Sequence, residues 1–237
     1  APVPVLRVTK EEEKLGMAAN ICHNLNALEV NSSLLSIIGN DAAADSVRLL
    51  LKRIGLADDD LISDSSIKTI SKSRVLTNSQ QICRIDYEEK SLSLSDQLNE
   101  LLTLKFNENC SKYQGIILQD YSKGILNISS TPRLIKDAKD KNIFIAVDPG
   151  RGKPATLYQG ANLLKPNLPE AKELVLSLGY EECSIEQMGE ILIDKLKLDN
   201  VVITLGANGM AMWSKSDGFR KIPTVAQSVF DVSGAGD

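Results

Sequence analysis

The sequence is poor in the side chains that most often bind zinc or drive hydrolysis. Its 237 residues contain one histidine, His23, and four cysteines that form no C-x-x-C pair. Zinc sites need closely spaced cysteines and histidines, and Ser-His-Asp hydrolases need a histidine. His23 directly follows Cys22, but adjacent residues on a helix point about 100° apart. Neither kind of site is expected, and Cys22, Cys83, Cys110 and Cys183 are predicted to be reduced packing residues of a cytoplasmic protein.

A basic surplus and a long apolar run are also missing. The chain has 27 basic and 31 acidic side chains, a formal net charge of −4. Proteins that coat nucleic acid or anionic membranes carry clustered positive charge, and a membrane span needs about 20 apolar residues in a row. The sequence therefore predicts no nucleic-acid partner and no membrane partner. Residues 1–5 show neither a signal peptide nor an initiator Met, so we expect a fragment or a processed product.

What is present is the composition of a folded α/β protein. Hydrophobic residues make up 43% of the chain and charged residues 24%, close to the average of soluble globular domains. Short β-branched runs alternate with longer amphipathic stretches, which predicts a mostly parallel sheet with helices on both faces. Ligands of such sheets bind beyond the carboxyl ends of the strands, where sharp loops follow at Asp120, Asp148, Asn167 and Gly206. The predicted strands are 34–38, 115–118, 143–147, 163–164 and 201–205, and the predicted helices are 42–54, 128–141, 168–178 and 185–196.

One region departs from this alternation. Residues 72–77 and 80–87 are two extended segments around Asn78-Ser79, which is the pattern of a β-hairpin. A hairpin among βα units predicts a small β lid that stands off the main sheet. Its polar residues either form a solvated outer face or point at a ligand, and the pattern favours neither.

The segment 231–237 has the residue types that phosphoryl transfer needs. Gly234, Ala235 and Gly236 let the backbone approach an anion closely, and a helix that begins there adds N–H groups and a positive dipole end. Asp237, at the end of this turn, is placed to accept a proton from a substrate hydroxyl. Positioning and charge stabilisation supply most of the catalysis in phosphoryl transfer. Taken alone, a Gly-Ala-Gly segment is weak evidence.

Four segments, in order, resemble the ribokinase-like carbohydrate kinases. Residues 231–237 resemble the C-terminal signature of that family, and residues 16–20 resemble its N-terminal Gly-Gly-x-x-x-Asn sugar motif. Residues 167–170 resemble its Asn-x-x-Glu motif, and residues 202–209 resemble its nucleotide-binding strand and glycine loop. The resemblance implies a single ribokinase-like domain over 1–237, incomplete at both ends, with lid elements around 1–15 and 72–88.

Four further segments, at the N-terminus, in the hairpin and in two loops, resemble one particular branch of this family. Residues 1–5, 74–76 with 80–88, 120–124 and 164–168 are similar to the heptose 7-phosphate kinase branch. That branch uses ATP and a divalent ion to phosphorylate the anomeric 1-hydroxyl of D-glycero-β-D-manno-heptose 7-phosphate, a step of ADP-heptose biosynthesis for the lipopolysaccharide core. The resemblance thus implies a cytoplasmic sugar kinase that uses ATP and Mg²⁺. It also implies a homodimer through the lid and a fusion to a nucleotidyltransferase domain.

By the same resemblance, Asp237 matches the catalytic base that deprotonates the sugar hydroxyl. Gly234, Ala235 and Gly236 match the anion hole that holds the transferring phosphoryl group.

Five residues match the nucleotide side of the family site. Asn167 and Glu170 match the pair that organises the ATP phosphates and Mg²⁺, with Glu170 acting on the metal through water. The structural alternative for this pair is a helix cap with a first-turn acid. Thr204, Gly206 and Gly209 match positions that line the nucleotide, and the alternative for them is a strand end and a turn.

Five residues are candidates for the sugar side. Asn20 matches the ligand of the sugar hydroxyls, and Gly16 matches one of the paired glycines at the lid hinge. Asp120 and Lys123 lie on a loop after a strand, where Lys123 can meet a sugar phosphate. Arg84 on the lid suits the 7-phosphate, because a guanidinium fork fits phosphate oxygens. A solvated surface charge is the alternative for both basic residues.

Several positions depart from the family pattern. Met17 replaces the second glycine of the pair, where a side chain restricts positive φ and crowds the sugar. The loop 150–153 differs from the usual Lys-Gly, so we expect Arg151 or Lys153 to supply the positive charge. The family's first strand, with its sugar aspartate, and the helix after Asp237 have no match, so these 237 residues alone are expected to have little or no kinase activity.

Two other readings stay open. One is another ribokinase-like sugar or nucleoside kinase, and the other is a non-catalytic binding paralogue of that fold. A nicotinamide dehydrogenase is disfavoured, because no Gly-x-Gly-x-x-Gly follows the first strand.

Overall fold

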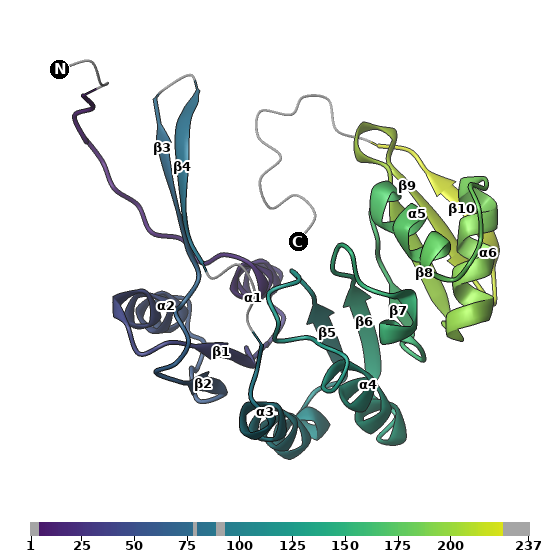
Figure 1. Ribbon diagram of the computed structural model, residues 1–237, viewed down its shortest axis with the longest axis horizontal. Coiled ribbons are helices and arrows are strands. Elements are labelled where there is room, and N and C mark those ends of the chain that lie inside the picture. The colour runs from purple at the N-terminus through teal and green to yellow at the C-terminus, as the bar shows by residue number, and fades with distance from the viewer. Residues whose placement is uncertain (1–4, 78–79, 89–92, 225–237) are drawn as a thin grey trace. The chain divides into compact units, whose positions relative to one another are not determined.

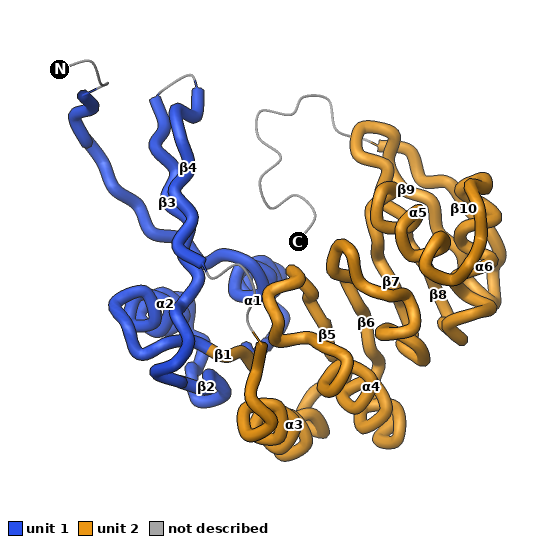
Figure 2. The backbone as a smooth tube through the Cα atoms, in the orientation of Figure 1, with its two compact units in different colours: residues 1–34, 38–88, 234–237 blue, residues 35–37, 89–233 orange. Residues whose placement is uncertain are grey.

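The computed structural model describes residues 5–77, 80–88 and 93–224 (Figure 1). The predicted anion hole and catalytic base at 234–237, and the hairpin tip at Asn78-Ser79, lie outside the described residues. Of the described residues, unit 1 holds 5–34, 38–77 and 80–88, and unit 2 holds 35–37 and 93–224 (Figure 2). Each unit is described by itself. The single-domain assignment with lid elements around 1–15 and 72–88 stays a prediction.

Unit 2 is built on a six-stranded sheet in the order β10-β9-β8-β7-β6-β5 (Figure 1). Its first four strands along the chain run parallel, whereas the last two pair antiparallel beside β8, so the predicted mostly parallel sheet is confirmed. The strands are β5 (Gly115–Gln119), β6 (Phe144–Asp148), β7 (Leu163–Leu164), β8 (Asn200–Thr204), β9 (Met210–Ser214) and β10 (Gly218–Ile222).

Four helices accompany this sheet. They are α3 (Asp96–Asn109), α4 (Thr131–Asp140), α5 (Leu168–Ser177) and α6 (Ile185–Leu196). The helix α4 packs on β6, and α6 packs on β8 and β9. Apolar side chains of the strands and helices form one buried core, in which Leu164, Leu192 and Val201 are fully buried. Three short 3₁₀ helices complete the unit: η1 (Cys110–Lys112), η2 (Ala155–Tyr158) and η3 (Gly206–Asn208).

Unit 1 has a smaller core and two small sheets. The core gathers apolar residues of two helices and the short strands, among them Cys22, Leu51 and Leu61. Residues 5–16 have no regular secondary structure. The elements that lie wholly in unit 1 are α1 (Ala18–Ala27), α2 (Ala42–Arg53), β2 (Leu61–Ser63), β3 (Ser71–Leu76) and β4 (Gln81–Tyr87), where β3 pairs with β4. The strand β1 (Ser36–Ile38), of which only Ile38 belongs to unit 1, pairs with β2.

The predicted hairpin is confirmed as the antiparallel pair β3–β4, and it is amphipathic. Lys72 pairs across the strands with Asp86, and Arg74 pairs with Arg84. Because side chains alternate between the faces of a strand, these four charges share one face. Val75, Ser73 and Ser71 face the other way, opposite Cys83, Ile85 and Tyr87. All of β4 is exposed.

Most of the predicted helices and strands lie within two or three residues of the observed ones, and the deviations have local causes. The helix predicted to start at residue 128 starts at Thr131, because Asn127 Oδ1 accepts the N–H groups of Ser129 and Ser130 and holds a turn there. The antiparallel pair β9–β10 and the helices α1 and α3 were not predicted.

The cysteines differ in burial. All four lie in the described part of the chain and are free; Cys22 and Cys110 are buried, and Cys183 is half-buried. Cys83 is exposed on the hairpin, so the prediction that it is a packing residue is wrong. Its position on a two-stranded sheet, in a strand that is exposed along its whole length, explains the exposure. Among the described residues, no helix is both long and apolar enough to cross a membrane.

Candidate active site

The carboxyl ends of β5, β6, β7 and β8 lie at one edge of the sheet of unit 2, which we call the rim. Gln119 at the end of β5 pairs with Asp148 at the end of β6. One strand pair further, Asn167 forms an isolated parallel bridge with Thr204, whose N–H donates to Pro166 at 3.0 Å. The rim therefore brings together Asp120, Asn167 and Thr204, which are far apart in sequence.

Asp120 is buried at the start of the loop after β5. Its Oδ1 accepts the Ser122 N–H at 2.7 Å, and its Oδ2 accepts the Tyr158 hydroxyl at 2.8 Å. Both oxygens are thus engaged in shaping the rim. A role of Asp120 in sugar binding stays a prediction. Each carboxylate oxygen has a second lone pair, and these lone pairs would accept hydrogen bonds from the sugar hydroxyls.

Asp148 lies beside it at the end of β6. Its Oδ2 accepts Gln119 Nε2 at 2.9 Å and lies 2.9 Å from Lys165 Nζ, and its side chain is only 14% exposed. The Lys165 ammonium and the Asp148 carboxylate thus form a partly buried ion pair in this part of the rim. The sequence had marked only the loop that follows Asp148.

Asn167 and Glu170 form a capping box at the start of α5. Asn167 Oδ1 accepts the Glu170 N–H at 2.9 Å, and Glu170 Oε2 accepts the Asn167 N–H at 2.9 Å. The structural alternative raised for this pair is thus present. It does not compete with a nucleotide role, because a capped N-terminus still presents its positive dipole end to an anion.

Glu170 differs electrostatically from an ordinary capping acid. Burial raises the pKa of its carboxyl, and the neighbouring Asp148 raises it further, whereas the Asn167 N–H and Lys165 oppose the shift. A carboxylate whose charged form is disfavoured in this way gains from a nearby cation. Hard carboxylate oxygens fit Mg²⁺, which keeps several waters. The described residues contain no cluster of three or more His, Cys, Asp or Glu that could hold a metal ion.

The predicted nucleotide loop after β8 is confirmed in shape but not in role. Gly206 has φ +58° and Gly209 has φ +83°. A Cβ on Gly209 would lie 2.1 Å from the Ile222 carbonyl oxygen, so this position requires glycine. A turn after β8 is enough to explain why both positions are glycine. The binding of a nucleotide by Thr204, Gly206 and Gly209 stays a prediction.

The loop 150–153 is held by α5. Arg151 Nε lies 3.3 Å from Glu173 Oε1, and the Gly152 N–H donates to Glu173 Oε2 at 3.1 Å. The Arg151 guanidinium is thus paired with a carboxylate. The supply of a positive charge by Arg151 or Lys153, and the role of Lys123, stay predictions. Both lysines are half-buried.

The other sugar-side candidates belong to unit 1. Gly16 is exposed, Asn20 lies in the first turn of α1, and the Asn20 N–H donates to the Gly16 and Met17 carbonyls. Met17 has φ +54° and ψ −137°, a conformation that L side chains rarely adopt. Met17 stands where the family motif has its second glycine, and its backbone has a positive φ, which glycine adopts freely.

Arg84 lies on the charged face of the hairpin. Its guanidinium makes two bonds to Asp86, at 2.8 and 3.0 Å, and Arg74 lies directly opposite. Like charges opposed across two strands are destabilising, and a bound anion relieves that cost. The sequence had identified Arg84 as a phosphate ligand but not its partner Arg74, and the two-residue period of the hairpin could have paired them.

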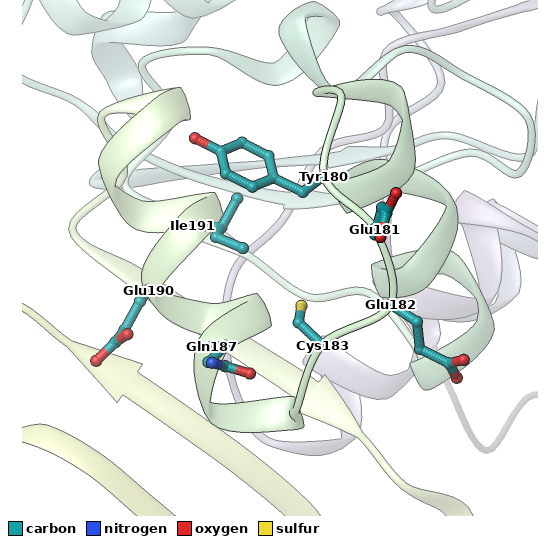
Figure 3. A pocket seen from close by; sticks show the side chains of 7 residues that line it. All are labelled: Tyr180, Glu181, Glu182, Cys183, Gln187, Glu190 and Ile191. Carbon is teal, nitrogen blue, oxygen red and sulfur yellow. The ribbon is translucent and has the colours of Figure 1, made fainter.

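A pocket elsewhere in unit 2 has no connection with these residues. It lies between the α5–α6 connection and the first turns of α6 (Figure 3). Three carboxylates line it and repel a polyphosphate, so it is not the nucleotide site. Its lining residues are Tyr180, Glu181, Glu182, Cys183, Gln187, Glu190 and Ile191.

Two solved kinase structures superpose on this chain. Phosphofructokinase-2 from Escherichia coli, in complex with fructose-6-phosphate, superposes with a TM-score of 0.77 at 15% identity, over 100% of this chain and 77% of that chain. Ribokinase from Arabidopsis thaliana, complexed with ribose and ATP, gives 0.69 at 20% identity, over 97% of this chain and 76% of that chain. At these identities the likeness shows the fold alone, and the predicted ribokinase-like α/β class is confirmed.

The chain belongs to the pfkB family of carbohydrate kinases, which it matches over residues 5–237. It is 35% identical over 237 residues to the bifunctional protein HldE of Wolinella succinogenes, covering 100% of this chain and 49% of the relative. The HldE protein of Haemophilus influenzae strain Rd is also 35% identical, with 100% and 48% covered. The chain therefore spans about half the length of the curated relatives it matches.

Proposed function

We propose that this chain is the kinase region of an enzyme that phosphorylates the anomeric 1-hydroxyl of D-glycero-β-D-manno-heptose 7-phosphate with ATP. The rim supports this proposal: it joins Asn167, Glu170 and Thr204, predicted to face the nucleotide, to the loop of Asp120 and Lys123, predicted to face the sugar. The similarity to bifunctional HldE proteins points to the same branch and to a second domain in the whole protein.

In the proposed reaction, Asp237 takes the proton of the 1-hydroxyl and the resulting oxygen attacks the γ-phosphorus of ATP. The phosphoryl group passes over the N–H groups of 234–236, and ADP leaves. Glu170, through a water, would hold Mg²⁺, which neutralises charge on the phosphates. The capping box keeps Asn167 and Glu170 at the α5 N-terminus, where the dipole favours the anion.

A phosphorylated sugar is favoured by the hairpin. Arg74 and Arg84 face each other at the same register position, and Arg74 has no ion-pair partner among the residues the structure describes. A phosphate between two guanidinium groups removes their repulsion.

The test is a coupled ADP-release assay on the protein expressed from its complete reading frame. Heptose 7-phosphate, fructose 6-phosphate, ribose and a nucleoside are compared by kcat/KM. We expect heptose 7-phosphate to exceed the others at least about tenfold, a difference of about 1.4 kcal/mol in transition-state binding. A preference for another acceptor contradicts the proposed substrate.

Asp237→Asn in the same protein tests the proposed base. General-base removal costs about 10²–10⁴-fold in kcat, while ATP binding measured by calorimetry is unchanged. Turnover at the wild-type rate excludes Asp237 as the base, and no turnover by the wild type with any of the acceptors favours the non-catalytic paralogue.

A further inference from the structure

Tyr158 lies beneath the rim and does not reach its surface. It ends η2, and its side chain is fully buried in the core of unit 2. A buried phenol hydroxyl needs hydrogen-bond partners. Tyr158 has two, since its hydroxyl donates to Asp120 Oδ2 at 2.8 Å and accepts the Gly150 N–H at 2.8 Å. One atom thus joins the loop after β5 to the loop after β6.

The two loops are packed directly on each other at this point. A Cβ on Gly150 would lie 2.6 Å from both Asp120 Cγ and Ser122 Oγ, so only glycine allows the approach. Ser122 Oγ donates to the Arg151 carbonyl at 2.9 Å, and the Asp120 N–H donates to the Asp148 carbonyl at 3.0 Å. The tyrosine hydroxyl fills the place where these loops would otherwise leave a buried carboxylate oxygen and a buried N–H unsatisfied.

Burial also keeps this hydroxyl in its donor form. Burial raises the pKa of Tyr158 well above its ordinary value, and the Asp120 carboxylate raises it further. The phenol therefore stays protonated at every pH at which the protein is assayed.

We infer that Tyr158 is a positioning residue: its buried hydroxyl fixes the Asp120 loop against Gly150 and thereby sets where the sugar-side groups of the rim lie. The inference rests on the proposed function for the identity of those groups. Lys123 follows Asp120 by three residues on the loop that Tyr158 holds. Asn167 and Glu170, in contrast, are fixed by their own capping box at 2.9 Å, which does not include Tyr158.

This division predicts a selective kinetic effect of Tyr158→Phe, which removes one oxygen and keeps the ring in the core. In the protein expressed from its complete reading frame, KM for the sugar phosphate should rise about five- to tenfold, while KM for ATP and kcat change less than about twofold. A residue that only stabilises the fold would lower the thermal midpoint and leave both KM values unchanged. Equal KM values for wild type and variant therefore exclude the positioning role.

The matched control is Tyr113→Phe, a half-buried tyrosine before the amino end of β5, which should change no kinetic parameter. A double variant with Asp120→Asn tests the route. If Tyr158 acts through Asp120, the two changes together raise KM less than the product of their separate effects. Multiplicative effects contradict a route through Asp120.

Amide hydrogen exchange separates this inference from the proposed function. Tyr158→Phe should speed exchange in segments 120–124 and 149–152 at least about tenfold, without changing α6, whatever the substrate. Unchanged exchange in both segments disproves the link even if the kinase assay succeeds. If the wild type prefers another sugar, the proposed substrate fails and the KM comparison is made with that sugar. Should Tyr158→Phe not fold, Ser122→Ala removes another bond between the same loops from an exposed position and should speed the same exchange to a smaller degree.

Discussion

Met17 begins α1 in a backbone conformation that glycine adopts freely and that other residues adopt at a cost. Its φ of +54° and ψ of −137° place its Cβ against the neighbouring backbone. The family motif has glycine here, and the substitution has not moved the chain into an ordinary conformation. The strain at Met17 therefore lowers the stability of the folded state. Asn20, the predicted sugar ligand, lies one turn further along the same helix.

Met17→Gly should relieve this strain. We expect the glycine variant to be more stable than Met17→Ala by about 1–3 kcal/mol, because alanine removes the same side-chain contacts but keeps the Cβ. The measurement is the opening free energy of the α1 amides by hydrogen exchange. An alanine variant as stable as the glycine variant contradicts the strain.

At the scale of elements, the sequence predicted the helices whose ends are marked by capping residues. Asp41, Asn167 and Ser184 each cap a helix that begins at the predicted residue. The period of two predicted the hairpin β3–β4. The pair β9–β10 was missed because its turn lies in a polar stretch and the adjacent Arg220 and Lys221 break the alternation of polar and apolar residues in β10.

The sequence predicted the polar residues of the candidate site but not the buried residues that hold them in place. Asn167, Glu170 and Asp120 belong to motifs or to sharp loops after strands, so the sequence marks them. Tyr158 carries no such signal, because its role depends on which loops the sheet brings together. Only the parallel register of β5 with β6 and of β6 with β7 puts those loops side by side.

Asp41 is expected to hold two segments of unit 1 together. Its Oδ1 accepts the Ala44 N–H and its Oδ2 accepts the Thr69 N–H, each at 2.9 Å. Asp41→Ala should destabilise α2 by about 1–2 kcal/mol, measured as loss of hydrogen-exchange protection. Asp41→Asn keeps the cap acceptor and should cost less. Protection in the alanine variant equal to the wild type would refute the role.

The same aspartate gives a pH dependence. Burial raises the pKa of Asp41, but the hydrogen bonds from Thr69 and Ala44 outweigh it and hold the pKa below the ordinary value of 3.8. A lowered folded-state pKa stabilises above the unfolded value and is lost as pH falls through the folded one. The difference between wild type and Asp41→Ala should therefore shrink as the pH falls below about 3.8.

At the scale of the whole molecule, the hairpin β3–β4 stands out because it forms a separate two-stranded sheet. An isolated two-stranded sheet is marginally stable in water, and exposed strand edges invite pairing. The apolar face of β3–β4 leaves Ile85 45% and Tyr87 56% exposed, beside the exposed Cys83. The charged face with Arg74 and Arg84 is the one predicted to meet the sugar phosphate. We expect the apolar face to contact a second copy of the chain, as in the homodimer through the lid that the family resemblance implies.

Ile85→Lys should weaken that dimer at least about tenfold in Kd, since an ammonium would be buried where the isoleucine packs. Sedimentation of the complete protein at micromolar concentration measures this as a shift from twice the chain mass towards the single chain mass. Lys72→Gln, on the opposite face of the same hairpin, is the matched control and should leave the dimer intact. A monomeric wild type, or an Ile85→Lys variant that sediments as the wild type does, contradicts the assignment of this face.

Cys83 lies on the same face of the hairpin and is exposed in the single chain. If the dimer forms through this face, Cys83 of each copy is covered. A thiol reagent should then label Cys83 more slowly in the wild type than in Ile85→Lys.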